Sequence, residues 1–378
     1  MIRVMLFAVV LSAIAGCSAS GTVRPALTKN ALLSGDSLFA SHAAKQAVPA
    51  AEVLRMDDAM HAFVAEQVGG ARAQDAKLLK LLNGMQSQGL LALDYDVGAT
   101  GTVRETFHNR TGNCLSFTML FVTLARAAGL HVSYEMVDVP PKWSAESGVL
   151  VLTQHINARI ETPYLQRDYV VDFDRSEFKA NYRRHEVSDR YALALFYSNR
   201  GAEALLDGNY QESFVNFKAA LETDPAAASA WVNLGLLYSR LGRNERAESA
   251  YLQALAVDAD EPSALTDLAA FYEKTGKDAE AAVYRKRIRR FQDQNPYYHY
   301  FLARDAYREQ RFAAALDSLG KAIKLKRDEH EFYLLQGRLY QSLGKPRDAE
   351  RSFALALKYI PAVGQAGGPP DIASDVLP

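Results

Sequence analysis

This 378-residue chain has few cysteines and a net charge close to zero, and each of these features excludes a class of function. There are two cysteines. Cys17 ends an N-terminal apolar segment and Cys114 opens an apolar helix, and each position gives its sulfur a role of its own, so no disulfide is expected. One remaining thiol and scattered histidines give no spacing typical of a metal site, and neither a metal nor another cofactor is predicted. A formal net charge of −1 at pH 7 gives no indication of nucleic-acid binding.

The apolar run at the N-terminus is too short to cross a membrane. One positive charge precedes about 11 mostly apolar residues, Val4–Ile14, a pattern typical of a secretory signal peptide. The run continues as Ala15-Gly16-Cys17, and together these residues resemble the bacterial lipobox. The resemblance implies a signal peptide over residues 1–16, whose removal leaves a lipid-modified Cys17 as the mature N-terminus. The alternative is an ordinary signal peptide cleaved near Ala19.

Lipid attachment at Cys17 predicts a protein held in the bacterial cell envelope. Ser18 follows, and the absence of aspartate there resembles the outer-membrane default of such lipoproteins, with the folded part facing the periplasm. Several buried acyl chains, such as palmitate, make an anchor of this kind stable. Residues 17–48 are rich in Ser, Ala, Gly and Lys and are expected to form a tether, and residues 364–378 a disordered tail.

The C-terminal half repeats with a fixed period. Gly208, Gly242 and Gly276 follow one another at 34-residue intervals, and Gly344 lies 68 residues further on, with Gln310 at the missing position. A second series of small residues has the same period: Gly201, Gly235, Ala269, Ala303 and Gly337. Small side chains allow the two helices of one repeat to cross closely, and a glycine after the first helix ends it in a left-handed turn.

This period resembles the tetratricopeptide repeat, and Trp231–Tyr238 is its clearest copy. The resemblance covers residues 194–363 as five repeats and implies an all-α solenoid whose concave face binds a protein or peptide partner. The repeats could instead be purely architectural. The basic run Arg285–Arg290 is expected to be a solvated helix face, with a docking patch for an acidic partner as the alternative.

Residues 49–190 lack this period and predict an α+β domain. Amphipathic helices are expected over residues 51–68 and 71–82, and a buried central helix over residues 115–128 with Gly129 as its stop. Strands are expected over residues 131–139, 149–153, 155–161 and 168–173. The order of these elements favours an antiparallel sheet packed on the central helix.

Cys114 stands at the expected N-terminus of the central helix. The aligned backbone N–H groups there favour the thiolate, which is the nucleophilic form. A thiol nucleophile needs a base, and the base needs a third group to fix its tautomer. His155 is the candidate base, because the segment His155–Ile160 alternates polar and apolar residues and places His155 and Asn157 on one strand face.

Asp172 is the candidate for the group that orients His155. If the two strands form a hairpin about Pro163-Tyr164, opposite residues have numbers that sum to 327, so His155 stands opposite Asp172. Asp174, displaced by two residues, is the rival, and Asp168 lies too near the turn.

These residues, in this order, resemble the bacterial transglutaminase-like domain. The resemblance rests on Gly112–Phe117, Leu124–Leu130, Gln154-His155 and Tyr169–Asp172, and covers about residues 95–180. It implies a papain-like fold with catalytic Cys114, His155 and Asp172. The chain departs from the family pattern with Asn157, where an aromatic often follows the histidine, and with Phe173, where a proline often follows the aspartate. The backbone N–H of Cys114 is the default oxyanion donor.

Together these features predict an envelope lipoprotein with a Cys-His-Asp thiol acyl-transfer domain, either a cysteine protease or amidase or a transglutaminase-type enzyme. The repeats would recruit its protein partner. The alternative is a catalytically inactive, peptide-binding scaffold lipoprotein that supports assembly. The other histidines are expected outside the site, with His108 as a surface or capping residue and His131 and His185 as exposed groups.

Overall fold

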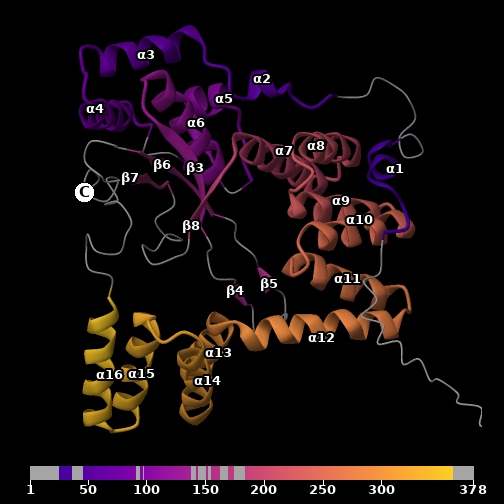
Figure 1. Cartoon of the computed structure of the whole chain (residues 1–378), viewed down its shortest axis with the longest axis vertical. Helices are drawn as coiled ribbons and strands as arrows, with labels where there is room; N and C mark the ends of the chain where they lie inside the picture. Colours follow the sequence, from indigo (N-terminus) through magenta and orange to yellow (C-terminus); the bar gives the residue numbers. More distant parts are fainter. Residues whose placement is uncertain are drawn as a thin grey trace, which may run out of the picture.

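The computed structural model describes residues 25–35, 46–90, 94–96, 98–137, 142–143, 150–151, 155–161, 169–173 and 184–360. The expected signal peptide, the lipidation site Cys17, the rivals Asp168 and Asp174, and the C-terminal tail all lie outside these ranges. The described chain is mostly helical, with a small sheet in the N-terminal half (Figure 1). No helix in the described ranges is long and apolar enough to cross a membrane.

The N-terminal half consists of helices gathered around one buried helix and a small sheet. The helices are α2 (Ala50–Val53), α3 (Asp58–Val68), α4 (Gln74–Ser87), α5 (Val103–Asn109) and α6 (Cys114–Ala127). The strands are β1 (Asp94–Tyr95), β2 (Thr111–Gly112), β3 (Val132–Val137), β4 (Lys142–Trp143), β5 (Leu150–Val151), β6 (His155–Ile160), β7 (Tyr169–Val171) and β8 (Arg184–Val187). Helix α6 touches α3, α5 and the strands β3 and β6, so it is the central element (Figure 1).

The main sheet has the strand order β7-β6-β3-β8, and all of its neighbours are antiparallel. Along β3 and β6 the residues alternate, and Tyr134, Met136, Ile156 and Ala158 are buried in the apolar core that includes α6. The other face of β6 carries His155 and the residues in phase with it. An antiparallel sheet packed on a buried helix confirms the α+β layout of this half.

Several expected elements differ in their bounds. The helix expected over residues 51–68 is two helices, because the Asp57 side chain accepts a hydrogen bond from the Met60 N–H and starts a new helix, α3. Residues 150–151 pair with β4 in a separate two-stranded sheet, so this segment is not a strand of the main sheet. His185 was expected in a linker but lies in β8, where it is exposed.

Within residues 184–360, ten helices pack as five successive pairs. They are α7 (Asp189–Leu206), α8 (Tyr210–Thr223), α9 (Ala228–Arg240), α10 (Asn244–Val257), α11 (Pro262–Lys274), α12 (Asp278–Gln294), α13 (Pro296–Arg308), α14 (Phe312–Leu325), α15 (His330–Ser342) and α16 (Pro346–Tyr359). The series of small residues lies where the two helices of a pair cross. A Cβ atom added at Gly201 would come within 2.5 Å of the Phe217 ring, which confirms the close crossing.

The glycine series ends the first helix of each pair, as predicted. Gly208, Gly242, Gly276 and Gly344 have φ values between 66° and 77°, in the left-handed region. Gln310, the odd member of the series, adopts the same conformation with φ 57°. The turn geometry is therefore retained even where the residue is not glycine.

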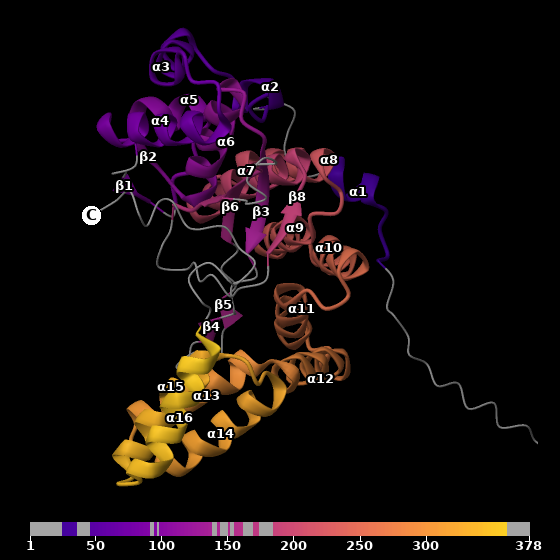
Figure 2. The same ribbon diagram turned by 60° about the vertical axis from the view of Figure 1, so that its left-hand side comes forward.

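Helix α7 belongs to the first repeat and also to the core of the N-terminal half. One continuous apolar core runs from Leu32 through α6, the sheet and α7 to Tyr284 in α12, and a second, separate core begins at Ala303. The expected boundary between residues 190 and 194 falls inside α7. Figures 1 and 2 show α13 to α16 away from the main sheet, with β4 and β5 between them, and β4 contacts α13.

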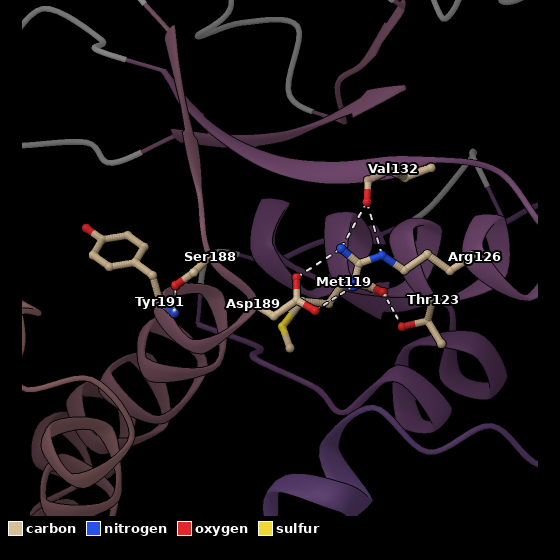
Figure 3. Close-up of polar contacts among 7 residues, drawn as sticks. All are labelled: Met119, Thr123, Arg126, Val132, Ser188, Asp189 and Tyr191. Carbon is tan, nitrogen blue, oxygen red and sulfur yellow. Dashed lines mark hydrogen bonds and ion pairs between the residues drawn. The ribbon is translucent and has the colours of Figure 1, made fainter. Parts of the chain in front are cut away.

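The N-terminal end of α7 is tied to the C-terminal end of α6. Arg126, in the last turn of α6, donates to both carboxylate oxygens of Asp189 at 2.7 and 2.9 Å (Figure 3). The same guanidinium donates to the carbonyl of Val132 at 3.0 and 2.9 Å. The guanidinium of Arg126 therefore links α6, the main sheet and α7 at one point.

Part of the region expected to be a tether is docked on the repeats. Helix α1 (Lys29–Leu33) buries Leu32 completely, and its C-terminal carbonyls accept hydrogen bonds from the repeat helices. Tyr238 donates to the Leu32 carbonyl, and Arg246 Nη1 donates to the Ala31 carbonyl at 2.8 Å. Residues 25–35 are therefore a packed element of the fold, and not free linker as the composition suggested.

Candidate active site

The site begins at the N-terminus of α6, where Cys114 is the first helical residue. The N-cap Asn113 accepts a hydrogen bond from the Ser116 N–H at 3.0 Å, and Cys114 itself is half-buried at the edge of the core. Gly112 lies so close that an added Cβ atom would be 2.9 Å from the Ser116 Cβ atom. The sequence Gly-Asn-Cys thus combines a close backbone approach, a helix cap and a thiol at the positive end of a buried helix.

His155 is brought to this thiol by the packing of α6 on β6. Thr118, one turn after Cys114, donates from its hydroxyl to the carbonyl of Ile156 at 3.2 Å. His155 is 1% exposed, and the Cys114 side chain is close enough to raise the pKa of its imidazole. Its Nε2 atom lies 2.6 Å from Oδ2 of Asp172, which is also buried, so Nδ1 is the ring atom left for the thiol. The structure therefore places Cys114, His155 and Asp172, the three candidate residues of the sequence analysis, next to one another.

The charged form of His155 is favoured despite its burial. Burial by itself lowers the pKa of the imidazole, but the hydrogen bonds with Asp172 and Cys114 and their negative charges raise it to about 10. The ring therefore carries a proton at neutral pH, with a carboxylate on one side and the sulfur on the other. A charged imidazole beside the sulfur, held by a third group, is the environment that a thiol nucleophile needs.

The register of the β6–β7 hairpin is not the expected one. Ala158 pairs with Val171 and Ile160 with Tyr169, so opposite residues sum to 329 and not to 327. The expectation was wrong by two residues because it placed the hairpin turn at Pro163-Tyr164, and a register two residues away has a different turn. Since side chains alternate with period two, the shift leaves His155 and Asp172 on the same face, where they meet on a diagonal.

Asn157 is a feature of the site that the sequence analysis left without a role. It is fully buried in β6, opposite Glu135 of β3, and on the same face as His155. Among the residues that the structure describes, neither its amide nitrogen nor its amide oxygen has a hydrogen-bond partner. The polar-apolar alternation of residues 155–160 placed Asn157 beside His155, but no pattern in the sequence indicated that its amide would be unsatisfied.

The remaining candidates lie away from this site. His108 is a surface residue, with Nε2 2.6 Å from Oδ2 of the capping residue Asp57, and His131 is exposed. In the basic run of α12, Arg285 pairs with Glu273 at 2.9 Å and Arg287 donates to the carbonyl of Ala259, which fits a solvated helix face. Among the described residues there is no group of three or more His, Cys, Asp or Glu side chains that could hold a metal ion.

Sequence comparisons identify the repeats. Residues 204–263 and 330–363 match families described as tetratricopeptide repeat, which confirms this part of the prediction. Photosystem I assembly protein Ycf3 of Synechococcus sp. (strain CC9902) is 32% identical over 111 residues, which are 29% of this chain and 64% of that protein. Tetratricopeptide repeat protein 37 of Xenopus laevis is 26% identical over 155 residues, 38% of this chain and 10% of that protein. The chain thus spans less than two thirds of the length of these relatives.

Comparison with solved structures finds matches at low similarity. MamA (residues 41 to the end) from Desulfovibrio magneticus RS-1 has 16% identity and a TM-score of 0.26, covering 46% of this chain and 96% of that chain. Pseudomonas aeruginosa pilF has 19% identity and a TM-score of 0.27, covering 47% of this chain and 82% of that chain.

Proposed function

We propose that the N-terminal half is a cysteine-dependent acyl-transfer domain of the transglutaminase-like type. The observation that carries this proposal is the Cys114-His155-Asp172 set, in which a thiol at a helix N-terminus lies beside a buried histidine whose Nε2 is 2.6 Å from a buried carboxylate oxygen. Isolated cysteines, histidines and aspartates have many structural roles. A hydrogen-bonded series of the three, in the order nucleophile, base and orienting group, is the arrangement that activates a thiol.

The chemistry would proceed in two stages. The Cys114 thiolate attacks an amide or ester carbonyl, while His155 gives its proton to the leaving group as the carbon–heteroatom bond breaks. The thioester is then opened by water, or by an amine, whose proton passes to His155. The carboxylate of Asp172 stabilises the imidazolium before the first transfer and after the second. The Cys114 backbone N–H, at the start of α6, is the donor available to the developing oxyanion.

The repeats form a protein-interaction scaffold, and we propose that they bring a protein or peptide partner to the thiol site. A second function is supported by the comparisons, because the relative Ycf3 is named as an assembly protein. In that function the N-terminal half binds a peptide without catalysis, and the repeats assemble a complex. The two proposals share the scaffold and differ in whether Cys114 reacts.

Thiol labelling separates these functions. In a chain carrying Cys17→Ser, Cys114 is the single cysteine, and its rate of reaction with iodoacetamide can be measured at pH 7. The enzyme proposal expects a rate well above that of a free cysteine, which falls to the free-cysteine rate or below in His155→Ala. A wild-type rate equal to that of free cysteine, unchanged in His155→Ala, would favour the assembly scaffold.

We also propose that Cys17 carries a lipid and holds the protein at the envelope, facing the periplasm. The proposal is supported by the sequence Ile14-Ala15-Gly16-Cys17 after a short apolar run. In the bacterial host, Cys17→Ser should move the protein from the membrane pellet to the soluble fraction while its thermal stability is unchanged. A Cys17→Ser protein that remains in the pellet after a high-salt wash would exclude a lipid as the main attachment.

A further inference from the structure

The contacts of α7 suggest that the first repeat helix supports the thiol site directly. Near its N-terminal end, α7 holds the last turn of α6 through the Asp189-Arg126 ion pair. Near its C-terminal end, Arg200 and Glu203 hold the loop that contacts the N-cap of α6. The two helices are therefore linked at both ends of α6, and the second link lies next to Cys114.

The link runs through Thr100, which is 1% exposed. Its backbone N–H donates to Oε1 of Glu203 at 2.9 Å, and its carbonyl accepts from Nη1 of Arg200 at 3.2 Å. Both backbone groups of this one buried residue are thus bound by side chains of a single helix, which fixes the position of Thr100 relative to α7.

From Thr100 the hydrogen bonds continue to α6, the helix that begins with Cys114. The amide Nδ2 of Asn113 donates to the Thr100 hydroxyl at 2.7 Å, and Asn113 Oδ1 caps α6 by accepting from the Ser116 N–H at 3.0 Å. The Ser116 hydroxyl donates to the same Oδ1 at 3.1 Å and accepts from the Gly101 N–H at 3.0 Å. The N-cap residue and the first turn of α6 are therefore held by the loop that α7 holds.

We infer that Glu203 is a positioning residue for Cys114. Through Thr100 it fixes the amide of Asn113, which sets the first turn of α6 and so the place of the thiol relative to His155. The inference rests on the proposed acyl-transfer function where it concerns reactivity, and on the hydrogen bonds alone where it concerns the helix cap. Because α7 is the first helix of the first repeat, the position of the repeat then affects the thiol site. A partner that displaces α7 would change the reactivity of Cys114.

The burial of Glu203 agrees with this role. Burial raises the pKa of its carboxyl, and the hydrogen bonds with Thr100 and the charge of Arg200 lower it in part. Burying a carboxylate costs free energy unless its oxygens accept hydrogen bonds. Here Oε1 of Glu203 accepts from the Thr100 backbone N–H, which would otherwise be buried and unsatisfied.

The test uses the full chain with Cys17→Ser, so that Cys114 is the only thiol, and three further variants. Glu203→Ala removes the acceptor of Thr100, Glu203→Gln keeps an acceptor oxygen without the charge, and Asp189→Ala removes the other α7–α6 link as a matched control. Two quantities are measured: the rate of alkylation of Cys114 by iodoacetamide at pH 7, and hydrogen exchange at the amides of Ser116 and Phe117.

Glu203→Ala is expected to lower the alkylation rate about three- to ten-fold, the range that loss of one helix N-cap interaction gives, and to speed exchange at Ser116. Glu203→Gln and Asp189→Ala should keep both quantities at the wild-type level. The inference is overturned if Glu203→Ala matches the wild type in exchange, or if Asp189→Ala has the same effect as Glu203→Ala, because α7 then stabilises α6 only in a general way.

Two further outcomes are decided by the same experiment. If Glu203→Ala does not fold, Thr100→Val takes its place, since it keeps the backbone N–H and the side-chain shape but removes the hydroxyl that Asn113 contacts, and the same two changes are expected. If the wild-type thiol reacts no faster than free cysteine, the acyl-transfer function fails, while hydrogen exchange at Ser116 still decides whether Glu203 positions the helix cap.

Discussion

Nε2 of His155 and Oδ2 of Asp172 lie 2.6 Å apart although the two residues are not opposite each other in the sheet. The β6–β7 pairing puts Ala158 opposite Val171, so Asp172 approaches His155 along the diagonal. Both side chains are buried on one face of the sheet, at the end where α6 begins. This diagonal contact pairs a carboxylate with an imidazole that also lies beside the thiol of Cys114.

The raised pKa of His155 predicts a pH dependence of stability. The pKa is about 10 in the folded chain, where Asp172 and Cys114 outweigh burial, against 6.5 for an ordinary histidine. Because the folded state holds the proton more tightly, this contribution is fully present below pH 6.5 and is lost as the pH rises through 10. The free energy of unfolding in urea, measured at pH 6, 8 and 10, should therefore fall relative to that of His155→Gln. A difference between the two proteins that stays constant over this range would contradict the prediction.

Asp172→Asn should lower turnover with little change in substrate binding. The carboxylate fixes the tautomer of His155 and stabilises its charged form, and triad mutants of this kind lose on the order of 10²–10⁴ in kcat. Acylation by an activated ester, followed at saturating ester, measures the loss. Asp174→Asn is the matched control and should cost much less. If Asp174→Asn is the inactive variant, Asp174 orients the histidine, and if neither changes the rate the Cys-His-Asp set does not act as a triad.

Replacing the unsatisfied amide of Asn157 should stabilise the protein. Neither polar atom of this buried side chain has a partner within the described part of the chain, so its desolvation is not offset there. Leucine has a similar shape without that cost. Asn157→Leu should raise the free energy of unfolding by about 1 kcal/mol in urea titration. Asn216→Leu is the control, because Asn216 is buried but donates to the Glu212 carbonyl at 2.9 Å, and its loss should destabilise. A destabilised Asn157→Leu would show that the amide has a structural partner in solution.

The shared core predicts which truncations fold. A chain that ends at Arg190 lacks α7, whose residues complete the core around α6 and whose Glu203 binds Thr100, so it should be insoluble or unfolded. A chain that ends at Gln294 keeps the first core whole and loses only the second one, which begins at Ala303. Circular dichroism and thermal unfolding should show a cooperative transition for the longer chain only. A soluble, cooperatively folded chain that ends at Arg190 would show that the N-terminal half is independent of the repeats.

The sequence by itself determined the elements whose signals are local. The 34-residue period places the repeats, because each repeat must bury the same small residues at the same helix crossing, and Gly201 against Phe217 is one such contact. Helix α6 starts at Cys114 and stops before Gly129, which follows from a cap residue, an apolar run and a left-handed glycine. His155 and Asp172 lie on one side of the sheet, as expected, because the observed register differs from the expected one by two residues, which is one full side-chain period.

Only the tertiary structure decided the relationships between elements far apart in the chain. The hairpin register depends on the turn, so the diagonal between His155 and Asp172 could not be read from alternation alone. The docking of Leu32 on the repeats joins residues about 206 apart, as in its bond with Tyr238, and no local pattern marks it. The same holds for Glu203, which lies 103 residues from Thr100 and yet accepts its N–H. Such contacts arise because buried polar groups must find partners in space, and the sequence near either residue does not say where those partners are.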